Sequence, residues 1–324
     1  MSALVAAAAL FSTSLFASAS AAPAQTCVEA PGPQGQLKGT MLSPATARAP
    51  VLLVIPGSGP VDRDGNSPLG VKAATYRMLA EALAEKGVAT ARIDKRGMFA
   101  SAGAIPDANN VTIEDYAADA HAWIEVIRSK TNAPCVWALG HSEGGLVALA
   151  AGQDANGLCG LILVSTAGRP LGAVLREQLR ANPANAPLLE QAETAIASLE
   201  AGRHIDVVGL HPAMQGLFSP RIQDFLIGEM RLDPVRLIAA YHGPVLIVHG
   251  DQDLQVKVED AERLKQADPD ARLVVLPKVN HVLKEVASDN KQANIATYAD
   301  PSLPIAPGVV DAVADFVLRP KQDR

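Results

Sequence analysis

The 324-residue sequence has few aromatic residues, few cysteines and no run of basic residues. Phe, Trp and Tyr together make up 4% of the chain, which argues against a site that stacks sugars or bases on aromatic rings. The formal net charge is -6, so neither nucleic acid nor an anionic membrane surface is an expected partner. We find no metal-ligand spacing and no dinucleotide fingerprint, and we therefore expect no metal and no cofactor.

The three cysteines are too few for a disulfide scaffold. Cys135 and Cys159 each open an apolar run that reads as a strand, and their sulfurs could approach if these strands are neighbours. An exported protein would permit that disulfide. Because the sequence does not give the directions of these side chains, we favour two buried free thiols.

Residues 1–21 have the pattern of a secretory signal peptide, with an apolar run followed by small residues and an Ala-x-Ala cleavage site. We therefore expect an exported protein, periplasmic or secreted, with no stable membrane association after cleavage. No Lys or Arg precedes the apolar run, which leaves an uncleaved anchor as the alternative.

The remaining chain alternates short apolar runs with helical patterns. This alternation predicts an α/β fold with a doubly wound, mostly parallel sheet, because the crossovers are long enough for parallel pairing. The expected strands are residues 37–42, Val51–Ile55, 88–93, 135–140, 159–164, 245–248 and Arg272–Leu276. The expected core helices are residues 73–86 and 113–129.

About seventy residues separate the strand at 159–164 from the next one, and they are helical in pattern at Leu171–Arg180, 186–201 and 221–230. We interpret residues 168–243 as a helical lid inserted after the sixth strand, between core segments 30–167 and 244–320. Its acidic residues have the spacing of exposed helix positions and are expected to be solvated; they are Glu177, Glu190, Glu193 and Glu200.

A nucleophile elbow is indicated by Gly140-x-Ser142-x-Gly144, which stands between an apolar strand and a helix of small residues. Such a turn lifts the serine hydroxyl above the sheet edge, at the N-terminus of the helix that follows. An oxyanion hole needs two backbone N–H donors close by. We assign them to Ser58, in the loop after Val51–Ile55, and to Glu143, the residue after the elbow serine.

The order of the chain predicts the partners of Ser142. In a hydrolase of this type an acid and then a histidine follow the nucleophile, and His281 is the only histidine beyond the strand at 245–248 and its exit loop. His281 would take the proton of Ser142, and a carboxylate would orient the imidazole. We prefer Asp253 to Asp251, since the acid needs a few residues of loop to reach the histidine.

Several motifs together carry a family resemblance. They are Pro56-Gly57-Ser58-Gly59-Pro60, Asp62-Arg63-Asp64-Gly65-Asn66, Asp94-Lys95-Arg96-Gly97, Gly140-His141-Ser142-Glu143-Gly144, His249-Gly250-Asp251-Gln252-Asp253 and Asn280-His281-Val282-Leu283-Lys284. The chain resembles the α/β-hydrolases, in particular small bacterial carboxylesterases related to serine aminopeptidases such as the proline iminopeptidases, and to monoglyceride lipases. The resemblance implies Ser142 as nucleophile, Asp253 as acid and His281 as base.

The charged loop would by its composition be a solvated turn. The resemblance instead implies that Asp62, Arg63 and Asp64 help to shape the substrate site. Phe99 stands where such proteins often carry small residues, and we expect it to narrow the entrance.

These observations predict a serine hydrolase that cleaves carboxylic esters of short to medium acyl chains through an acyl-enzyme. A small-molecule ester is thus the expected partner. Two alternatives use the same triad, an aminopeptidase of the proline-iminopeptidase type and a thioesterase. A non-catalytic binding protein is the third. A peptidase would need lid carboxylates turned inward to hold the substrate amine, so the positions of Glu190 and Glu193 discriminate.

Overall fold

The computed structural model describes residues 22–46, 48–287 and 290–319. The predicted signal peptide at residues 1–21 lies outside these residues. The strands are β1 (Ala24–Pro31), β2 (Gln36–Ser43), β3 (Val51–Ile55), β4 (Ala89–Ile93), β5 (Val136–His141), β6 (Leu158–Val164), β7 (Val245–Gly250) and β8 (Arg272–Leu276).

The helices that pack on the sheet or its ends are α1 (Thr75–Glu85), α2 (Ile113–Thr131), α3 (Glu143–Ala151), α8 (Pro234–Ala240), α9 (Val258–Ala267), α10 (Lys291–Ala296) and α11 (Pro307–Leu318). Between β6 and β7 lie also α4 (Leu171–Arg180), α5 (Leu189–Glu200), α6 (Pro212–Leu217) and α7 (Gln223–Met230). Short 3-10 helices are η1 (Phe99–Ala104), η2 (Pro183–Leu188), η3 (Pro220–Ile222) and η4 (Thr297–Ala299).

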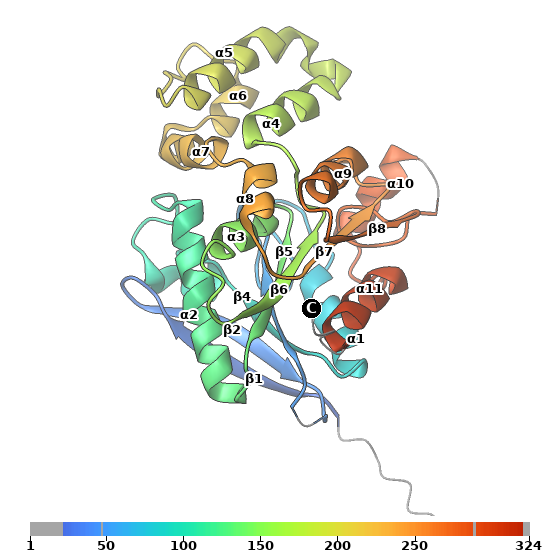
Figure 1. Ribbon diagram of the computed structural model, residues 1–324. Coiled ribbons are helices and arrows are strands. Elements are labelled where there is room, and N and C mark those ends of the chain that lie inside the picture. The colour runs from blue at the N-terminus through green and yellow to red at the C-terminus, as the bar shows by residue number, and fades with distance from the viewer. Residues whose placement is uncertain (1–21, 47, 288–289, 320–324) are drawn as a thin grey trace, which may run out of the picture.

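The eight strands form one sheet in the order β1-β2-β4-β3-β5-β6-β7-β8 (Figure 1). β1 pairs antiparallel with β2, β2 pairs antiparallel with β4, and the pairs from β4 to β8 are parallel. Helices cover both faces. The structure therefore confirms the predicted α/β architecture with a mostly parallel sheet.

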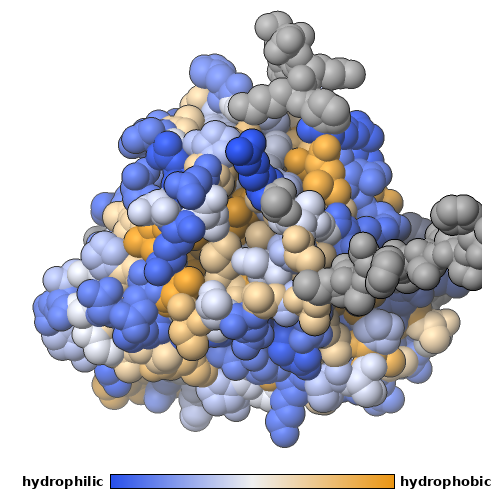
Figure 2. All heavy atoms as spheres, turned by 90° about the horizontal axis from the view of Figure 1, so that it is seen from below, coloured by the Kyte–Doolittle hydropathy of each residue, from blue (hydrophilic) through white to orange (hydrophobic). Residues whose placement is uncertain are grey.

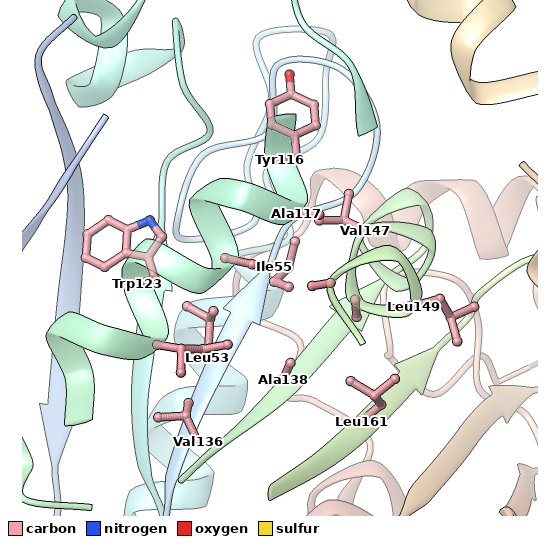
Figure 3. Close-up of a cluster of buried hydrophobic side chains, with 14 of the residues drawn as sticks. Leu53, Ile55, Tyr116, Ala117, Trp123, Val136, Ala138, Val147, Leu149 and Leu161 are labelled. Atoms are coloured by element: carbon pink, nitrogen blue, oxygen red, sulfur yellow. The ribbon is translucent and has the colours of Figure 1, made fainter. Parts of the chain in front are cut away.

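The core lies on both faces of the central strands because alternate side chains of a strand point to opposite sides. Leu53 of β3 packs on the face that α2 and α3 cover, with Trp123 of α2 (Figure 3). Leu52 and Val54 pack on the other face with α1 and α11. A strand buried on both faces needs a continuous apolar run, which is the pattern that β3 has.

Helices α4 to α7, with α8 after them, form a helical insertion beyond the carboxyl ends of the strands (Figure 1). The insertion has a hydrophobic cluster of its own, in which Ile196 and Leu199 of α5 and Phe218 are buried. The predicted helix at 171–180 is α4, and the one at 186–201 corresponds to η2 followed by α5. The insertion begins after the sixth strand.

Strand β1 corrects the predicted boundary of the core, which began at residue 30. β1 pairs with β2 along all of its eight residues and so belongs to the sheet. Val28 and Ala30 are its buried residues, because it is an edge strand with one side mostly exposed. A strand with so few apolar residues gives little signal in the sequence.

Cys135 and Cys159 form a disulfide, so the preference for two free thiols was wrong. β5 and β6 are neighbouring parallel strands, and the two cysteines lie where these strands begin. Their Cα atoms are 5.1 Å apart, which is within the usual range for a disulfide. The bond lies at the amino ends of these strands, on the side of the sheet opposite to the insertion.

Figure 2 shows the molecule from the side opposite to the insertion, where hydrophobic and hydrophilic side chains are interspersed over the surface. Within the described part of the chain, no helix combines the length and the apolar character that crossing a membrane requires.

Candidate active site

Ser142 lies in the sharp turn between β5 and α3, with a φ of 56° and a ψ of -122°. A left-handed φ is strained for serine, and the surroundings hold it in place. Its N–H donates to the carbonyl oxygen of Val164, and its own carbonyl accepts from Gly145. A Cβ on Gly140 would lie 2.0 Å from the carbonyl oxygen of Gly144, so this turn has no space for a larger residue at position 140.

His281 and Asp253 form a hydrogen-bonded pair. Nδ1 of His281 lies 2.7 Å from Oδ2 of Asp253, and both side chains are buried. The other carboxylate oxygen accepts the backbone N–H groups of Gln255 and Val256. Burial raises the pKa of Asp253, but the adjacent His281 and the hydrogen bond from Val256 outweigh it and lower the pKa to about 2. Asp253 is therefore ionised at neutral pH and keeps the proton of His281 on Nδ1, which leaves Nε2 free to accept a proton.

Asp251 has a different position. It is exposed, and its carboxylate accepts the backbone N–H of Lys278. Of the two acids considered from the sequence, the structure thus places Asp253 against His281.

His141, the residue before Ser142, connects the elbow to the segment of His281. Its Nε2 lies 2.8 Å from the backbone oxygen of His281, and the two rings are 4.8 Å apart between centroids. Its Nδ1 lies 2.9 Å from the hydroxyl of Tyr76. Burial, with a contribution from His281, lowers the pKa of His141 from 6.5 to about 3, so His141 is neutral.

A cavity of about 430 Å³ lies between the strand ends and the helical insertion. Ser142 lines it together with Ser58 and Glu143, the two residues assigned to the oxyanion hole. The amide of Glu143 is at the first position of α3, where N–H groups have no partner within the helix. His281 and Asp253 do not line this cavity. The contact of His141 with the backbone oxygen of His281 connects this pair to the elbow.

The walls of the cavity are largely apolar. Helix α4 contributes Leu171, Val174 and Leu175, and the segment around α7 contributes Leu217, Ile222, Phe225, Leu226 and Leu232. An apolar cavity that reaches a serine suits a ligand with a hydrocarbon group.

None of the four residues expected to shape the substrate site, Asp62, Arg63, Asp64 and Phe99, lines this cavity. Arg63 pairs with Asp94 at the end of β4, and Asp64 pairs with the buried Arg92. Asp62 accepts the backbone N–H groups of residues 64 and 66. The charges of Arg63 and Asp64 therefore pair within the protein, and these ion pairs hold the loop after β3 against the end of β4.

Phe99 is also outside the cavity. Its side chain is 41% exposed at the start of η1, and the neighbouring Met98 lines the cavity instead.

Three charged residues in the cavity wall, Lys95, Arg169 and Glu229, were not assigned a role from the sequence. Lys95, in the loop after β4, places its ammonium 3.1 Å from the carboxylate of Glu143. Glu229 of α7 is 7% exposed. Burial raises the pKa of Glu229 well above its ordinary range, and the charge of Glu143 adds to this effect. Lys95 belongs to the motif Asp94-Lys95-Arg96-Gly97, which is a signal that could have indicated a role for it. Nothing in the sequence of α7 indicates that Glu229 faces inward.

The lid carboxylates considered from the sequence point elsewhere. Glu193 pairs with Arg176 and Arg180, Glu190 is exposed, and neither lines the cavity. Glu177 and Glu200 are in ion pairs with Arg169 and Arg176. In the described residues, no group of three or more His, Cys, Asp or Glu side chains could hold a metal ion.

Several known proteins are similar to this chain. Lipase 3 of Moraxella sp. (strain TA144) is 27% identical over 200 residues, which span 55% of this chain and 62% of the lipase. The esterase Est1E of Butyrivibrio proteoclasticus, solved with ferulic acid, has a TM-score of 0.54 at 20% identity and covers 88% of this chain and 96% of its own. Proline iminopeptidase of Mycobacterium smegmatis has a TM-score of 0.58 at 18% identity, covering 90% and 97%.

At these identities the solved structures establish the fold, which is that of the α/β-hydrolases. The sequence of residues 69–285, more than half of the chain, matches the family described as "Serine aminopeptidase, S33". The chain therefore belongs to this family of α/β-hydrolases.

Proposed function

We propose that this hydrolase cleaves carboxylic esters of short to medium acyl chains through an acyl-enzyme on Ser142. The observation that carries the proposal is the apolar cavity of about 430 Å³ that ends at Ser142. Its volume suits a small ligand, and its apolar walls suit an acyl chain better than a peptide backbone. The similarity to a lipase supports the same substrate class.

In the proposed reaction, Nε2 of His281 takes the proton of Ser142 while the serine oxygen attacks the ester carbonyl. The carboxylate of Asp253, 2.7 Å from Nδ1, stabilises the imidazolium that forms. The N–H groups of Ser58 and Glu143 receive the developing oxyanion. His281 then gives its proton to the leaving alcohol, and a water activated in the same way releases the acid.

The helical insertion acts in this proposal as a lid. It supplies most of the apolar wall, and it would keep bulk water from the acyl group during reaction. We also propose that the protein is exported. The disulfide between Cys135 and Cys159 supports this, since such bonds persist in oxidising compartments.

An aminopeptidase is the second candidate, and Glu229 favours it. This carboxyl group comes from the insertion and lines the cavity, as the recognition of a substrate amine would require. Its raised pKa argues against this role, because a neutral carboxyl group attracts an ammonium less strongly than a carboxylate does.

The test is hydrolysis of p-nitrophenyl acetate, butyrate, octanoate and palmitate beside alanine and proline p-nitroanilides, with wild type and Ser142→Ala. Ester turnover that disappears in Ser142→Ala supports the esterase. Anilide turnover with weak ester turnover would instead establish the peptidase.

Glu229→Gln separates the two candidates further. This change keeps the shape of the neutral acid, so an esterase should retain its ester turnover within about a factor of three. A peptidase that binds the amine through Glu229 should lose its anilide turnover. If neither substrate class is turned over, acyl thioesters are the next substrates, and failure there leaves a binding protein.

A further inference from the structure

We propose that Lys95 is a positioning residue for the oxyanion hole, because its ammonium fixes the Gly57–Ser58 peptide with the N–H of Ser58 directed at the reacting carbonyl oxygen. The inference rests on the proposed function and adds to it a residue that acts through the backbone of the loop after β3.

The contacts of Lys95 join the two halves of the oxyanion hole. Its side chain is buried, and Nζ donates to the carbonyl oxygen of Gly57 at 2.7 Å and to the carboxylate of Glu143 at 3.1 Å. The ring of Tyr116 lies beside the ammonium, 5.1 Å from Nζ to the ring centroid. One charge thus connects the loop after β3 to the first residue of α3.

The first of these contacts sets the direction of an oxyanion donor. The carbonyl of Gly57 and the N–H of Ser58 belong to the same peptide group, and in a trans peptide they point to opposite sides. A hydrogen bond that holds the Gly57 oxygen therefore also directs the Ser58 N–H. The donor is an ammonium, so the bond is stronger than a neutral one and polarises the peptide toward a better N–H donor.

The preceding peptide is held as well. The N–H of Gly57 donates to the hydroxyl of Tyr76 at 3.1 Å, and that hydroxyl lies 2.9 Å from Nδ1 of His141. Nε2 of His141 faces the backbone oxygen of His281, which can only accept. His141 is neutral, so its single proton is on Nε2, and Nδ1 accepts from the Tyr76 hydroxyl.

These bonds form a continuous path from Gly57 through Tyr76 and His141 to the backbone of His281. Gly57 itself has little free space, since a Cβ there would lie 3.2 Å from Cβ of Ser142. The N–H and the carbonyl of Gly57 are thus both held in the described structure, the N–H by Tyr76 and the carbonyl by the charged Lys95.

A purely structural role for Lys95 would be to neutralise the buried carboxylate of Glu143. The two roles make different predictions once that carboxylate is removed. Neutralisation becomes unnecessary in Glu143→Gln, whereas the bond to Gly57 is still required.

The experiment compares Glu143→Gln with the double variant Lys95→Met/Glu143→Gln, which leaves neither charge of the pair unbalanced and is therefore expected to fold. Lys95→Met alone is added, with Lys86→Met as the control, because Lys86 is in an exposed ion pair with Asp311. The measurements are kcat and KM for p-nitrophenyl butyrate, thermal unfolding, and the rate at which diethyl p-nitrophenyl phosphate modifies Ser142, followed by mass.

The double variant should have a kcat roughly ten- to hundred-fold below that of Glu143→Gln, with KM changed by less than about threefold, since an oxyanion donor acts mainly in the transition state. Phosphorylation of Ser142 should slow in parallel. Equal kcat and equal phosphorylation rates in the two variants would overturn the inference.

Failure of the proposed function is distinguishable from failure of this inference. If wild type hydrolyses no ester but its Ser142 is phosphorylated, the substrate proposal is wrong and the phosphorylation rates still decide the role of Lys95. If wild-type Ser142 is not phosphorylated, both are overturned.

Discussion

At the residue scale, the environments of Asp253 and Asp251 differ although the two lie two positions apart. The Asp253 side chain is 1% exposed and contacts His281, while Asp251 is exposed and closes a loop through Lys278. The same type of side chain therefore holds a histidine at one position and closes a loop at the other.

Asp253→Asn should keep the fold and lower the turnover of p-nitrophenyl butyrate by on the order of 10⁴-fold, because the amide no longer favours the reactive tautomer of His281. Asp251→Asn is the matched control and should retain most activity. Steady-state kinetics and circular dichroism check both variants. Near-normal turnover in Asp253→Asn would contradict the assignment of the acid.

His141 should make the protein sensitive to acid. Its pKa is lowered to about 3 in the folded state from 6.5, so between these values the unfolded chain binds the proton and the folded chain does not. The stabilisation is complete above pH 6.5 and is lost as the pH falls toward 3. Since His141 is fully buried, the loss from pH 7 to about pH 4.5 is roughly 2–3 kcal/mol.

His141→Asn, which does not titrate, should reduce this pH dependence. Urea unfolding of both proteins at the two pH values measures the difference, and only the change with pH matters, because the substitution also alters stability directly. An unchanged pH dependence would show that His141 is protonated in the folded state.

At the scale of the element, the sequence predicts best what is buried by continuous runs or fixed by chain order. Val51–Ile55 was predicted with its observed bounds, because every residue of β3 is buried. The positions of Ser142 and His281 followed from the strands that precede them. β1 was missed, since few of its side chains are buried.

The helical insertion marks the other limit. Its helices could be predicted from periodicity, but not which side chain faces the cavity, because that depends on how the helices pack on the sheet. Glu229 faces the cavity, whereas Glu190 and Glu193 do not. The same limit applies to Arg63 and Asp64, whose partners lie at the end of β4 and just after it, about thirty residues farther along the chain.

Val174 of α4 lines the cavity and offers a test of the insertion as acyl wall. Val174→Phe should shorten the cavity and lower kcat/KM for the octanoate ester by roughly tenfold relative to the acetate ester, since a pocket discriminates by about this much per methylene excluded. Val208→Phe, at an 82% exposed position of the same insertion, is the control. A chain-length profile that is unchanged in Val174→Phe would contradict the proposed acyl wall.

At the scale of the whole molecule, the disulfide and the candidate active site lie at opposite ends of the parallel strands. Cys135 and Cys159, 24 residues apart in sequence, join the beginnings of β5 and β6, while Ser142 follows the end of β5. A change at the disulfide should therefore alter stability, and a change at Ser142 should alter reactivity, each with little effect on the other property.

Cys135→Ser/Cys159→Ser should lower the free energy of unfolding by about 3 kcal/mol, because the unfolded chain regains the conformational entropy that a closed loop of this length removes. The melting temperature should fall by several degrees, on the order of 2 °C per kcal/mol for a chain of this size. Calorimetry and the ester assay at 25 °C, the temperature to which these energies refer, check this. If turnover at that temperature fell as far as in Ser142→Ala, stability and reactivity would not be separate.

The central claim is that Ser142 carries the acyl group of an ester during turnover. The most direct measurement is acid quenching of wild type within the first turnovers of p-nitrophenyl butyrate, followed by peptide mapping by mass spectrometry. We predict a butyryl group on the peptide that contains Ser142 and none in Ser142→Ala. Sustained ester turnover by Ser142→Ala, or a butyryl group on another residue alone, would contradict the account.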